Sequence, residues 1–424
     1  MGWNIVLDKF KEIRDRAAST GKELWAYDRQ KETCLEYWVS VLDEGPYKEN
    51  CLELLRYLEL NEHEDFLLIR YGNYSDVFSG EDEKVTFDSF WDLEGGFYRE
   101  CRSVVIDIRR AELVLTPFRK FRNLNESEET SYEEVAERIR RASCVEFSNK
   151  LDGSMQCARF YRDRIVMAGS QALDRTNSWR LKDGYRMLCE KPGYEKMLRE
   201  HPDKTFIFEY ISHKDAHVVK YDQEGLFLIG IRDVGTGKEA DYREVLEYAS
   251  RYDLPTTELF DKTLDQVVSE LDLRKSSEAE GFVLNVDGFK VKIKYNDYVY
   301  MHKVLSALSS VNLIIQNIAE DRFDDFIAKI PKAYHDRVFK VARVVGEYAK
   351  TQNELVEKAY LAAPKGDQKE FMVWVNENVD RKLQGYVRNR YLGRKVNVLK
   401  RRNGYIKLKE MGVEDYSRFF KEEE

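Results

Sequence analysis

The sequence predicts an α+β protein in which an antiparallel-sheet domain is followed by an all-α C-terminal domain. Short β-rich runs alternate with helical patterns through the first 300 residues, and tight turns such as NVDGFK join neighbouring runs. After about Tyr295, apolar residues recur at three-and-four spacing instead. We therefore expect two domains, residues 1–300 and 301–424, which suits a chain of 424 residues.

The first domain is expected to contain more strand than helix. Strands are predicted at residues 102–108, 111–118, 164–170, 205–211, 226–234, 281–287 and 289–294. Helices are predicted in the amphipathic start MGWNIVLDKFKEIRDRA and at residues 241–253 and 264–272. Hairpin-type connections favour a twisted antiparallel sheet over a βαβ nucleotide fold.

The C-terminal domain is expected to be helical, with its clearest apolar stripes at residues 298–320, 334–363 and 369–387. Near its end, the segment Arg381 to Lys409 contains eleven Lys or Arg residues and no acidic residue, although the net charge of the whole chain is −8. Tyr386, Tyr391 and Tyr405 are interleaved with these charges. The pattern fits a surface that neutralises phosphates and stacks bases, and it equally fits a solvated helical face.

Composition excludes several other classes of protein. No run of 18 apolar residues exists and the N-terminus does not resemble a signal peptide, so we expect a cytoplasmic protein without membrane contact. The six cysteines form no C-x-x-C pair, which argues against structural zinc and a disulfide framework. His213 and His217 are four residues apart, but their surroundings read as strand and loop, so we expect both on the surface rather than on a metal.

The stretch FSNKLDGSMQ, residues 147–156, contains the first candidate for chemistry. In an extended segment Lys150 and Asp152 point the same way, and Gly153 then lets the backbone turn sharply. A lysine becomes a nucleophile when it loses its proton, which nearby cations and desolvation favour, so cations are expected beside Lys150. Alone the motif is weak, because Asp-Gly is also a common hairpin turn.

The strand FKVKIKY offers those cations. Lys290, Lys292 and Lys294 fall on one face of the strand and the apolar residues on the other, an arrangement that could direct ammonium groups at a polyphosphate. An ordinary amphipathic edge strand has the same pattern.

Two single carboxylates interrupt apolar strand sequence, Glu209 in FIFEYI and Glu280 in SEAEGFVL. A carboxylate among aromatic and apolar residues is unfavourable unless it meets a metal, a cation or a hydroxyl. Each could also be a solvent-facing strand residue.

The order of these pieces resembles the lysine-adenylating nucleotidyltransferases, the superfamily of ATP-dependent ligases and capping enzymes. Lys-x-Asp-Gly is followed by Phe-Glu-Tyr, Glu-Gly-Phe-Val and an alternating Lys-x-Lys, and the sequence is most similar to the bacteriophage T4 RNA ligase 1 family. The likeness extends upstream to RECRSVVID and FRKFRNLNE and covers roughly residues 98 to 302. It implies an adenylyltransferase domain of the nucleotidyltransferase (ATP-grasp-like ligase) fold over residues 1–300 and a helical RNA-binding specificity domain over 301–424.

The resemblance implies a role for each matching residue. Lys150 would attack the α-phosphate of ATP to form a lysyl-AMP phosphoramidate, while Arg102 and Lys120 would hold the departing phosphates. Lys292 and Lys294 would engage the phosphates during transfer. Positive charge suits these positions because the transition state spreads negative charge over the phosphate oxygens.

The resemblance also implies a site for Mg²⁺ (or Mn²⁺). Glu280 would orient metal-bound water, with Glu209 and Asp152 completing the shell through water, and carboxylates are the ligands that Mg²⁺ prefers. Glu209 would also contact the ribose. The nucleotide site would further include Asp152, Gly153 and Tyr298.

Two positions depart from the family pattern. Ser103 replaces the glycine that usually follows the arginine, and Ala168 stands where the phage enzyme has a lysine. Either one nucleotide contact is missing at Ala168, or Arg175, Arg180 or Lys182 supplies it.

We therefore expect an ATP-dependent RNA ligase that seals 5′-phosphate and 3′-OH ends, acting on broken structured RNA such as nicked tRNA, with Arg381 to Lys409 as a candidate RNA contact. The alternatives are a capping-type guanylyltransferase or a DNA ligase, and a catalytically silent RNA-binding protein on the same scaffold. The capping and DNA enzymes follow the last lysine motif with a β-rich domain, whereas this sequence becomes helical at once.

Overall fold

The computed structural model divides the chain into two compact units, Met1–Val299 and Tyr300–Glu424. The structure describes residues 3–72, 90–215, 217–309, 311–328, 330, 335–401 and 404–413. Within these residues, no helix has both the length and the apolar character needed to span a bilayer.

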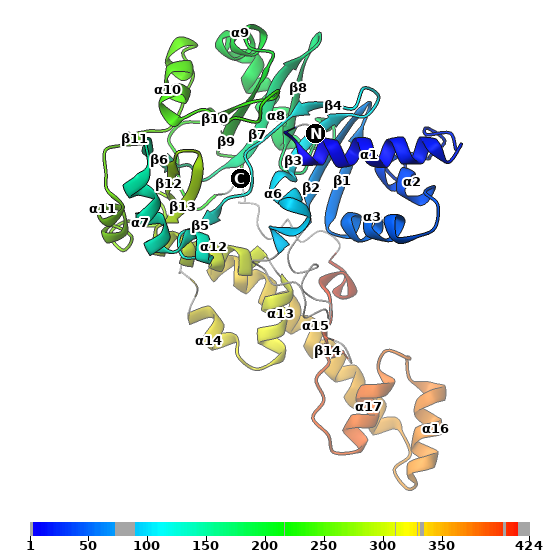
Figure 1. The fold of residues 1–424 in the computed structure, drawn as a ribbon. Coiled ribbons are helices and arrows are strands. Elements are labelled where there is room, and N and C mark those ends of the chain that lie inside the picture. The colour runs from blue at the N-terminus through cyan, green and yellow to red at the C-terminus, as the bar shows by residue number, and fades with distance from the viewer. Residues whose placement is uncertain are drawn as a thin grey trace. The chain divides into compact units, whose positions relative to one another are not determined.

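Three sheets make up most of the first unit (Figure 1). The first sheet has the order β1-β2-β3-β4, from Leu58–His63, Phe66–Tyr71, Arg102–Asp107 and Glu112–Leu115. The second has the order β10-β9-β7-β8, from Gly225–Asp233, Lys204–Ile211, Ser154–Tyr161 and Arg164–Gly169. The third has the order β11-β6-β12-β13-β5, from Leu259–Phe260, Val145–Lys150, Gly281–Val286, Phe289–Lys294 and Arg122–Asn123.

Strand pairing is antiparallel throughout these sheets except between β13 and β5, which run parallel. The seven predicted strands are all present, and the NVDGFK turn joins β12 to β13 as expected. The fourth strand of the first sheet is shorter than predicted. It ends at Leu115, and Pro117 two residues later has no N–H to extend a ladder.

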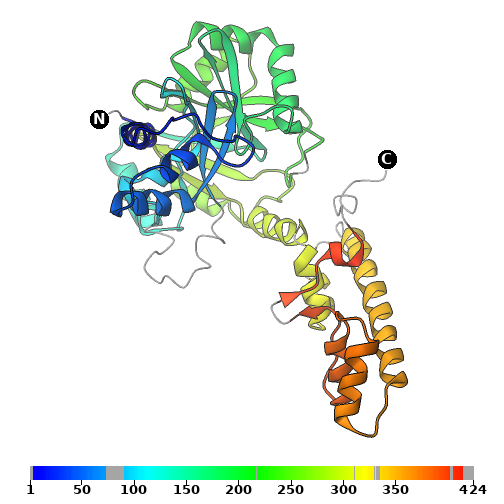
Figure 2. The same ribbon diagram turned by 90° about the vertical axis from the view of Figure 1, so that its right-hand side faces the viewer.

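Helices cover the outer faces of the first two sheets (Figure 2). The N-terminal helices pack on the first sheet: α1 (Ile5–Ser19), α2 (Cys34–Ser40) and α3 (Pro46–Arg56). On the second sheet lie α8 (Trp179–Glu190), α9 (Pro192–Glu200) and α10 (Tyr242–Arg251). A third apolar cluster, which includes Leu68, Val105, Cys157 and Ile207, fills the space between the two sheets.

The remaining helical segments of the first unit are short. They are α6 (Phe97–Glu100), α7 (Tyr132–Arg141), α11 (Leu264–Ser269) and the 3₁₀ turns η1 (Leu93–Gly95) and η2 (Glu128–Thr130). The next helix, α12 (Asn296–Ser309), begins directly after β13 and contains the boundary between the units.

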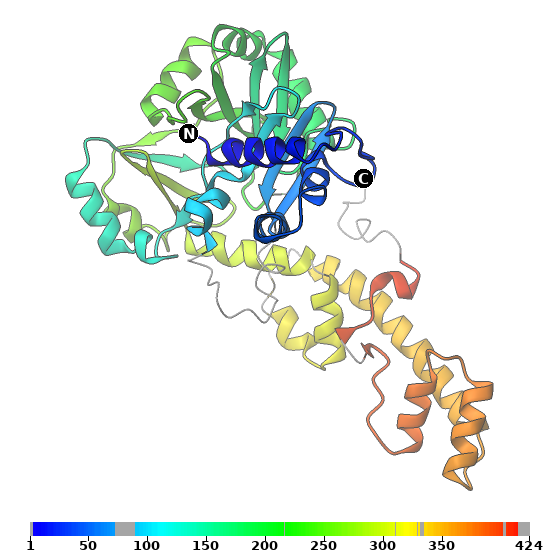
Figure 3. The ribbon, with the colours of Figure 1, turned by 45° about the vertical axis from the view of Figure 1, so that its right-hand side comes forward.

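The second unit is mainly helical and has its own apolar core (Figure 3). Its helices are α13 (Val311–Ala319), α14 (Phe323–Ala328), α15 (His335–Ala362), α16 (Gln368–Asn378) and α17 (Gln384–Tyr391), followed by the 3₁₀ turn η4 (Leu408–Met411). It also contains the two-residue strands β14 (Lys400–Arg401) and β15 (Gly404–Tyr405), which the expectation of an all-α domain did not include. Strands this short carry no readable periodicity.

Candidate active site

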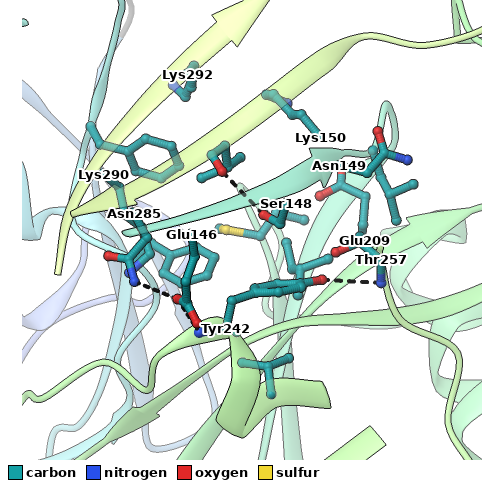
Figure 4. A pocket seen from close by; sticks show the side chains of 18 of the residues that line it. Glu146, Ser148, Asn149, Lys150, Glu209, Tyr242, Thr257, Asn285, Lys290 and Lys292 are labelled. Carbon is teal, nitrogen blue, oxygen red and sulfur yellow. Dashed lines mark hydrogen bonds between the residues drawn. The ribbon is translucent and has the colours of Figure 1, made fainter. Parts of the chain in front are cut away.

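The main functional candidate is a cavity between the second and third sheets, with about 800 Å³ of empty space that includes its opening to solvent (Figure 4). Strands β6, β12 and β13 form one wall, with Lys150, Val283 and Lys292 facing the space. The other wall comes from the second sheet, with Met155 and Glu209. The cavity therefore lies where the sequence motifs converge.

Strand register aligns the motif residues in rows across the third sheet. Gly281 on β12 pairs with Lys150 on β6 and with Lys294 on β13. Two residues along, Val283 pairs with Ser148 and Lys292. Because side chains alternate along a strand, both rows lie on one face of the sheet.

Glu280 joins two of the predicted lysines. Its Oε2 accepts a hydrogen bond from Lys150 Nζ at 2.7 Å, and its Oε1 lies 2.8 Å from Lys294 Nζ. The Glu280 side chain is 3% exposed and that of Lys150 is 20% exposed. Burial raises the pKa of Glu280, but the two ammonium groups outweigh this effect and hold the pKa below its ordinary value.

Two glycines allow close backbone contacts at the site, one against β13 and one against β9. A Cβ on Gly281, whose φ is +149°, would lie 2.1 Å from the Ile293 carbonyl oxygen. A Cβ on Gly153 would lie 2.5 Å from the Tyr210 carbonyl oxygen and 2.9 Å from the Glu209 side chain. The glycine of the Lys-x-Asp-Gly motif is thus required by packing against β9.

Arg102 and Lys292 form a cationic group in the lining of the main cavity. Both lie over the Phe121 ring, with Lys292 Nζ at 4.7 Å and the Arg102 guanidinium carbon at 5.3 Å from its centroid. No carboxylate among the described residues lies within ion-pair distance of Lys292. Burial and then the neighbouring cations Arg102, Lys120, Lys150 and Lys294 lower the pKa of Lys292 well below its ordinary value. Such a group attracts an anion.

Lys120 lies at an adjoining cavity of about 510 Å³, which shares Phe121 and Lys290 with the main cavity. Its ammonium group stands 5.2 Å from the Trp91 ring centroid and 5.5 Å from that of Tyr71. Lys290, on the same face of β13 as Lys292, forms an ion pair with Glu239 instead of facing an open anion site.

Glu209 projects from β9 into the main cavity. Burial raises its pKa to about 7, with Lys150 opposing the shift and Glu280 adding to it. Its carboxylate has no hydrogen-bond partner within the described part of the chain. A carboxylate in this position gains most from a cation or a hydroxyl group.

Asp152 and Tyr298 hold the motif loop together. Asp152 Oδ2 accepts from the backbone N–H groups of Val218 and Val219 at 2.9 and 3.0 Å, and its Oδ1 accepts from the Tyr298 hydroxyl at 2.9 Å. Tyr221 Oη accepts from the Asp152 N–H at 2.7 Å. The Asp152 carboxylate therefore positions the motif loop through protein donors, and the water-mediated metal role expected from the sequence stays a prediction.

His217 contradicts the expectation of a surface residue. Its Nε2 lies 3.1 Å from Asp215 and its Nδ1 lies 3.6 Å from Asp152, with the side chain 18% exposed. Arg180 makes a two-pronged contact to the same Asp215, at 2.7 Å for each bond. The loop between β9 and β10 folds back onto the motif, which strand periodicity cannot predict. His213, by contrast, is 61% exposed, as expected.

The structure accounts for the two departures from the family pattern. Ser103 has φ +72°, a conformation that glycine adopts readily, and its buried hydroxyl donates to the Ser170 carbonyl at 2.6 Å. Ala168 is 2% exposed in the core between the first two sheets. The residues suggested to replace the missing lysine contact at Ala168 do not line the main cavity. They are Arg175, Arg180 and Lys182.

The basic segment Arg381 to Lys409 offers charge and partly buried aromatic rings. Tyr391 stacks on buried Phe371 at 4.0 Å, and Tyr386 and Tyr405 pack against the core of the second unit. Each ring therefore has one side against the protein, and base stacking by the other side stays a prediction. Several cations have carboxylate partners: Arg390 with Glu357, Lys395 with Asp321, and Arg401 with Glu410. Arg402 and Asn403 lie outside the described residues.

Three residues that shape the site were not identified from the sequence. Tyr221 accepts a hydrogen bond from the Asp152 N–H, and Phe121 and Thr257 line the main cavity. Phe121 lies inside the FRKFRNLNE run, which resembles the family in sequence, so that run could have pointed to it. Nothing in the local sequence of Thr257 distinguishes it from other loop threonines.

Comparison with known proteins places these motifs in a family. Residues 100–306 match a family model described as RNA ligase, of the T4 RNA ligase 1 type. A curated protein of Thermovibrio ammonificans named "Putative RNA ligase" is 28% identical over 243 residues, which cover 53% of this chain and 60% of that protein. The chain thus spans about three fifths of the length of this relative.

Solved structures of Naegleria gruberi RNA ligase are also similar. One with PPi and one of a mutant with ATP and Mn each have a TM-score of 0.34 and 19% identity, and each match covers 40% of this chain and 55% of the other. Residues 100–306 are thus similar to the RNA ligase family of the T4 RNA ligase 1 type.

Proposed function

We propose that the protein is an ATP-dependent RNA ligase whose nucleophile is Lys150. The observation that carries this proposal is the convergence of Lys150, Lys292 and Arg102 on one cavity, with Glu280 paired to both Lys150 and Lys294 next to it. The match of residues 100–306 to an RNA ligase family model supports the same function.

The proposed reaction has three steps. Lys150 Nζ, after losing a proton, attacks the α-phosphorus of ATP, the bond to the bridging oxygen breaks, and pyrophosphate leaves. A 5′-phosphate of RNA then displaces Lys150 and takes up the AMP group. Finally a 3′-hydroxyl attacks that phosphate, AMP leaves, and a phosphodiester bond remains.

The cationic group supports the first step. Arg102 and Lys292, which have no carboxylate partner among the described residues, can take the outer phosphates of ATP, and Lys120 extends this positive surface into the adjoining cavity. Positive charge held in place before the reaction stabilises the transition state without reorganisation. Gly153 and the Asp152–Tyr298 bond fix the position of Lys150.

The donor set also fits a divalent cation. Glu209 and Glu280 would hold it, since Glu209 is a carboxylate without a hydrogen-bond partner in the described chain and oxygen ligands suit Mg²⁺ and Mn²⁺. When bound, the ion would neutralise phosphate charge.

We further propose broken structured RNA, such as nicked tRNA, as the substrate, with the second unit as the RNA-binding part and the protein acting in the cytoplasm. Within the basic segment, Arg381, Lys382, Arg394, Lys400, Lys407 and Lys409 have no ion-pair partner among the described residues. Contact there would depend mainly on phosphates, because the tyrosines have one side against the protein.

Labelling tests the proposal directly. The protein is incubated with Mg²⁺ and each α-³²P nucleoside triphosphate in turn, and covalent label is followed on a denaturing gel. We expect label from ATP in the wild type and none in Lys150→Ala. Label from GTP alone would indicate a capping-type enzyme, and no label from any nucleotide would indicate a silent RNA-binding protein.

A further inference from the structure

Two residues that line the main cavity carry a buried polar atom without a hydrogen-bond partner in the described chain. They are Arg102, through Nη1, and Thr257, through Oγ1. Thr257 is 5% exposed. A buried hydroxyl without a partner is unfavourable, so an atom of this kind on a residue that lines a cavity points to a ligand.

The two atoms lie toward opposite sides of Lys150. The third sheet has the order β11-β6-β12-β13-β5, so Lys292 and Lys294 flank Lys150 on the β13 side. On the other side, β11 pairs Leu259 with Ser148, and the Asn149 N–H donates to the Glu258 carbonyl at 2.9 Å. Extending this register places Thr257 beside Lys150. Arg102 shares the Phe121 ring with Lys292 and so belongs to the cationic side.

Away from Lys150 and Glu209, Thr257 has largely apolar neighbours in the cavity lining. Its backbone N–H donates to the Tyr242 hydroxyl at 3.2 Å, a bond drawn in Figure 4, and that leaves Oγ1 as the uncommitted group. Ile229 and Val245 line the same cavity. Flat apolar space with one neutral hydroxyl suits a nucleobase, whereas the side with Arg102 and Lys292 suits phosphates.

We propose that Thr257 is a specificity-determining residue whose hydroxyl hydrogen-bonds the adenine base of ATP. This inference rests on the proposed function, since that function supplies ATP as the ligand. The base would extend from Lys150 toward β11 while the phosphates extend toward β13. The hydroxyl then gains a partner with an adenine in place, by accepting from the exocyclic amino group or donating to a ring nitrogen, and a guanine can use the hydroxyl as well only if the site lets it present its carbonyl oxygen there.

Equilibrium binding tests this assignment without requiring catalysis. ATP, GTP and 2′-deoxy-ATP are titrated by calorimetry into the wild type, Thr257→Val and Thr257→Ser. We expect Thr257→Val, which keeps the shape and loses the hydroxyl, to raise the Kd for ATP about 10-fold, with the same increase for 2′-deoxy-ATP and a smaller preference for ATP over GTP. Thr257→Ser should bind ATP as the wild type does.

Three results would overturn the assignment. The first is an unchanged Kd for ATP in Thr257→Val. The second is an equal loss of affinity in Thr257→Ser, which would indicate packing of the methyl group, and the third is a loss that disappears with 2′-deoxy-ATP, which would show that the hydroxyl contacts the ribose. Thermal melting of each variant verifies folding. If the wild type binds ATP but forms no covalent adduct, the ligase function fails while the comparison of Thr257 variants stands.

Discussion

At the scale of single residues, the site is organised by one carboxylate shared between two lysines. Glu280 contacts Lys150 and Lys294 from between their strands, which keeps both ammonium groups at the cavity. The sequence predicted cations beside Lys150, whereas the contact at hydrogen-bond distance is this carboxylate. A buried ion pair of this kind is most informative when one partner is removed, because the other charge then remains uncompensated.

His217 provides a pH-dependent prediction. Burial lowers its pKa, but Asp215, Asp152 and Glu209 outweigh that effect and hold the pKa above its ordinary value. Because the pKa is raised in the folded state, the resulting stability is fully present below the unfolded pKa of about 6.5 and is lost as pH rises through the folded pKa. Arg180 also bonds to Asp215, which limits the stability that protonated His217 adds to the folded state.

We therefore expect His217→Gln to lower the free energy of unfolding most below pH 6.5 and progressively less above it. Urea unfolding at several pH values measures this difference. His213→Gln is the matched control from the same loop, and we expect only the small effect usual for an exposed substitution. A pH-independent difference in His217→Gln would show that the imidazole is held by packing alone.

At the scale of elements, the site depends on a close contact between the motif loop and strand β9, which only a glycine permits. Gly153 lies against the β9 backbone at the end of the motif loop. We expect Gly153→Ala to destabilise the protein by about 1–3 kcal/mol through overpacking and to reduce adenylylation, because the loop that carries Lys150 must shift.

Gly235→Ala is the control for that substitution. Its Cβ would make an ordinary contact at 3.5 Å with the Asp233 side chain in a surface turn. Chemical unfolding and the labelling assay are run on both variants. Equal stability of Gly153→Ala and the wild type would mean that β9 and the motif loop are farther apart than the structure has them.

The elements also show what the sequence could and could not predict. Lys150, Glu209, Glu280, Lys292 and Lys294 were identifiable because they are charged residues in or next to predicted strands, and because their order along the chain resembles that of a known family. Asp215, His217 and Thr257 were not, because they reach the site through loops whose course depends on tertiary packing. The stacking of Tyr391 on Phe371 was not predictable either, because it depends on the fold of the second unit.

At the scale of the whole molecule, the two units have separate cores. Buried apolar residues of the first unit extend to Tyr298, and the cluster described for the second unit runs from Val311 to Val413. Tyr298 in α12 belongs to the first unit through its bond to Asp152. The predicted boundary at residue 300 lies one residue from the division between the units.

A chain that ends at Ser309 keeps α12 and removes α13, whose Ile314 and Ile315 belong to the second core. We expect it to become adenylylated like the full chain but to seal nicked tRNA at least about 10-fold more slowly, because phosphate contacts of the second unit are lost. Gel assays of label uptake and of sealing at two salt concentrations separate the two activities. Equal sealing by both chains would remove the RNA-binding role from the second unit.

Peptide mapping by mass spectrometry after incubation with ATP and Mg²⁺ tests the central claim most directly. The account predicts one AMP adduct, located on Lys150, in the wild type and in Lys290→Gln, whose wild-type lysine is paired with Glu239. An adduct on Lys292 or Lys294 while Lys150 remained unmodified would contradict it.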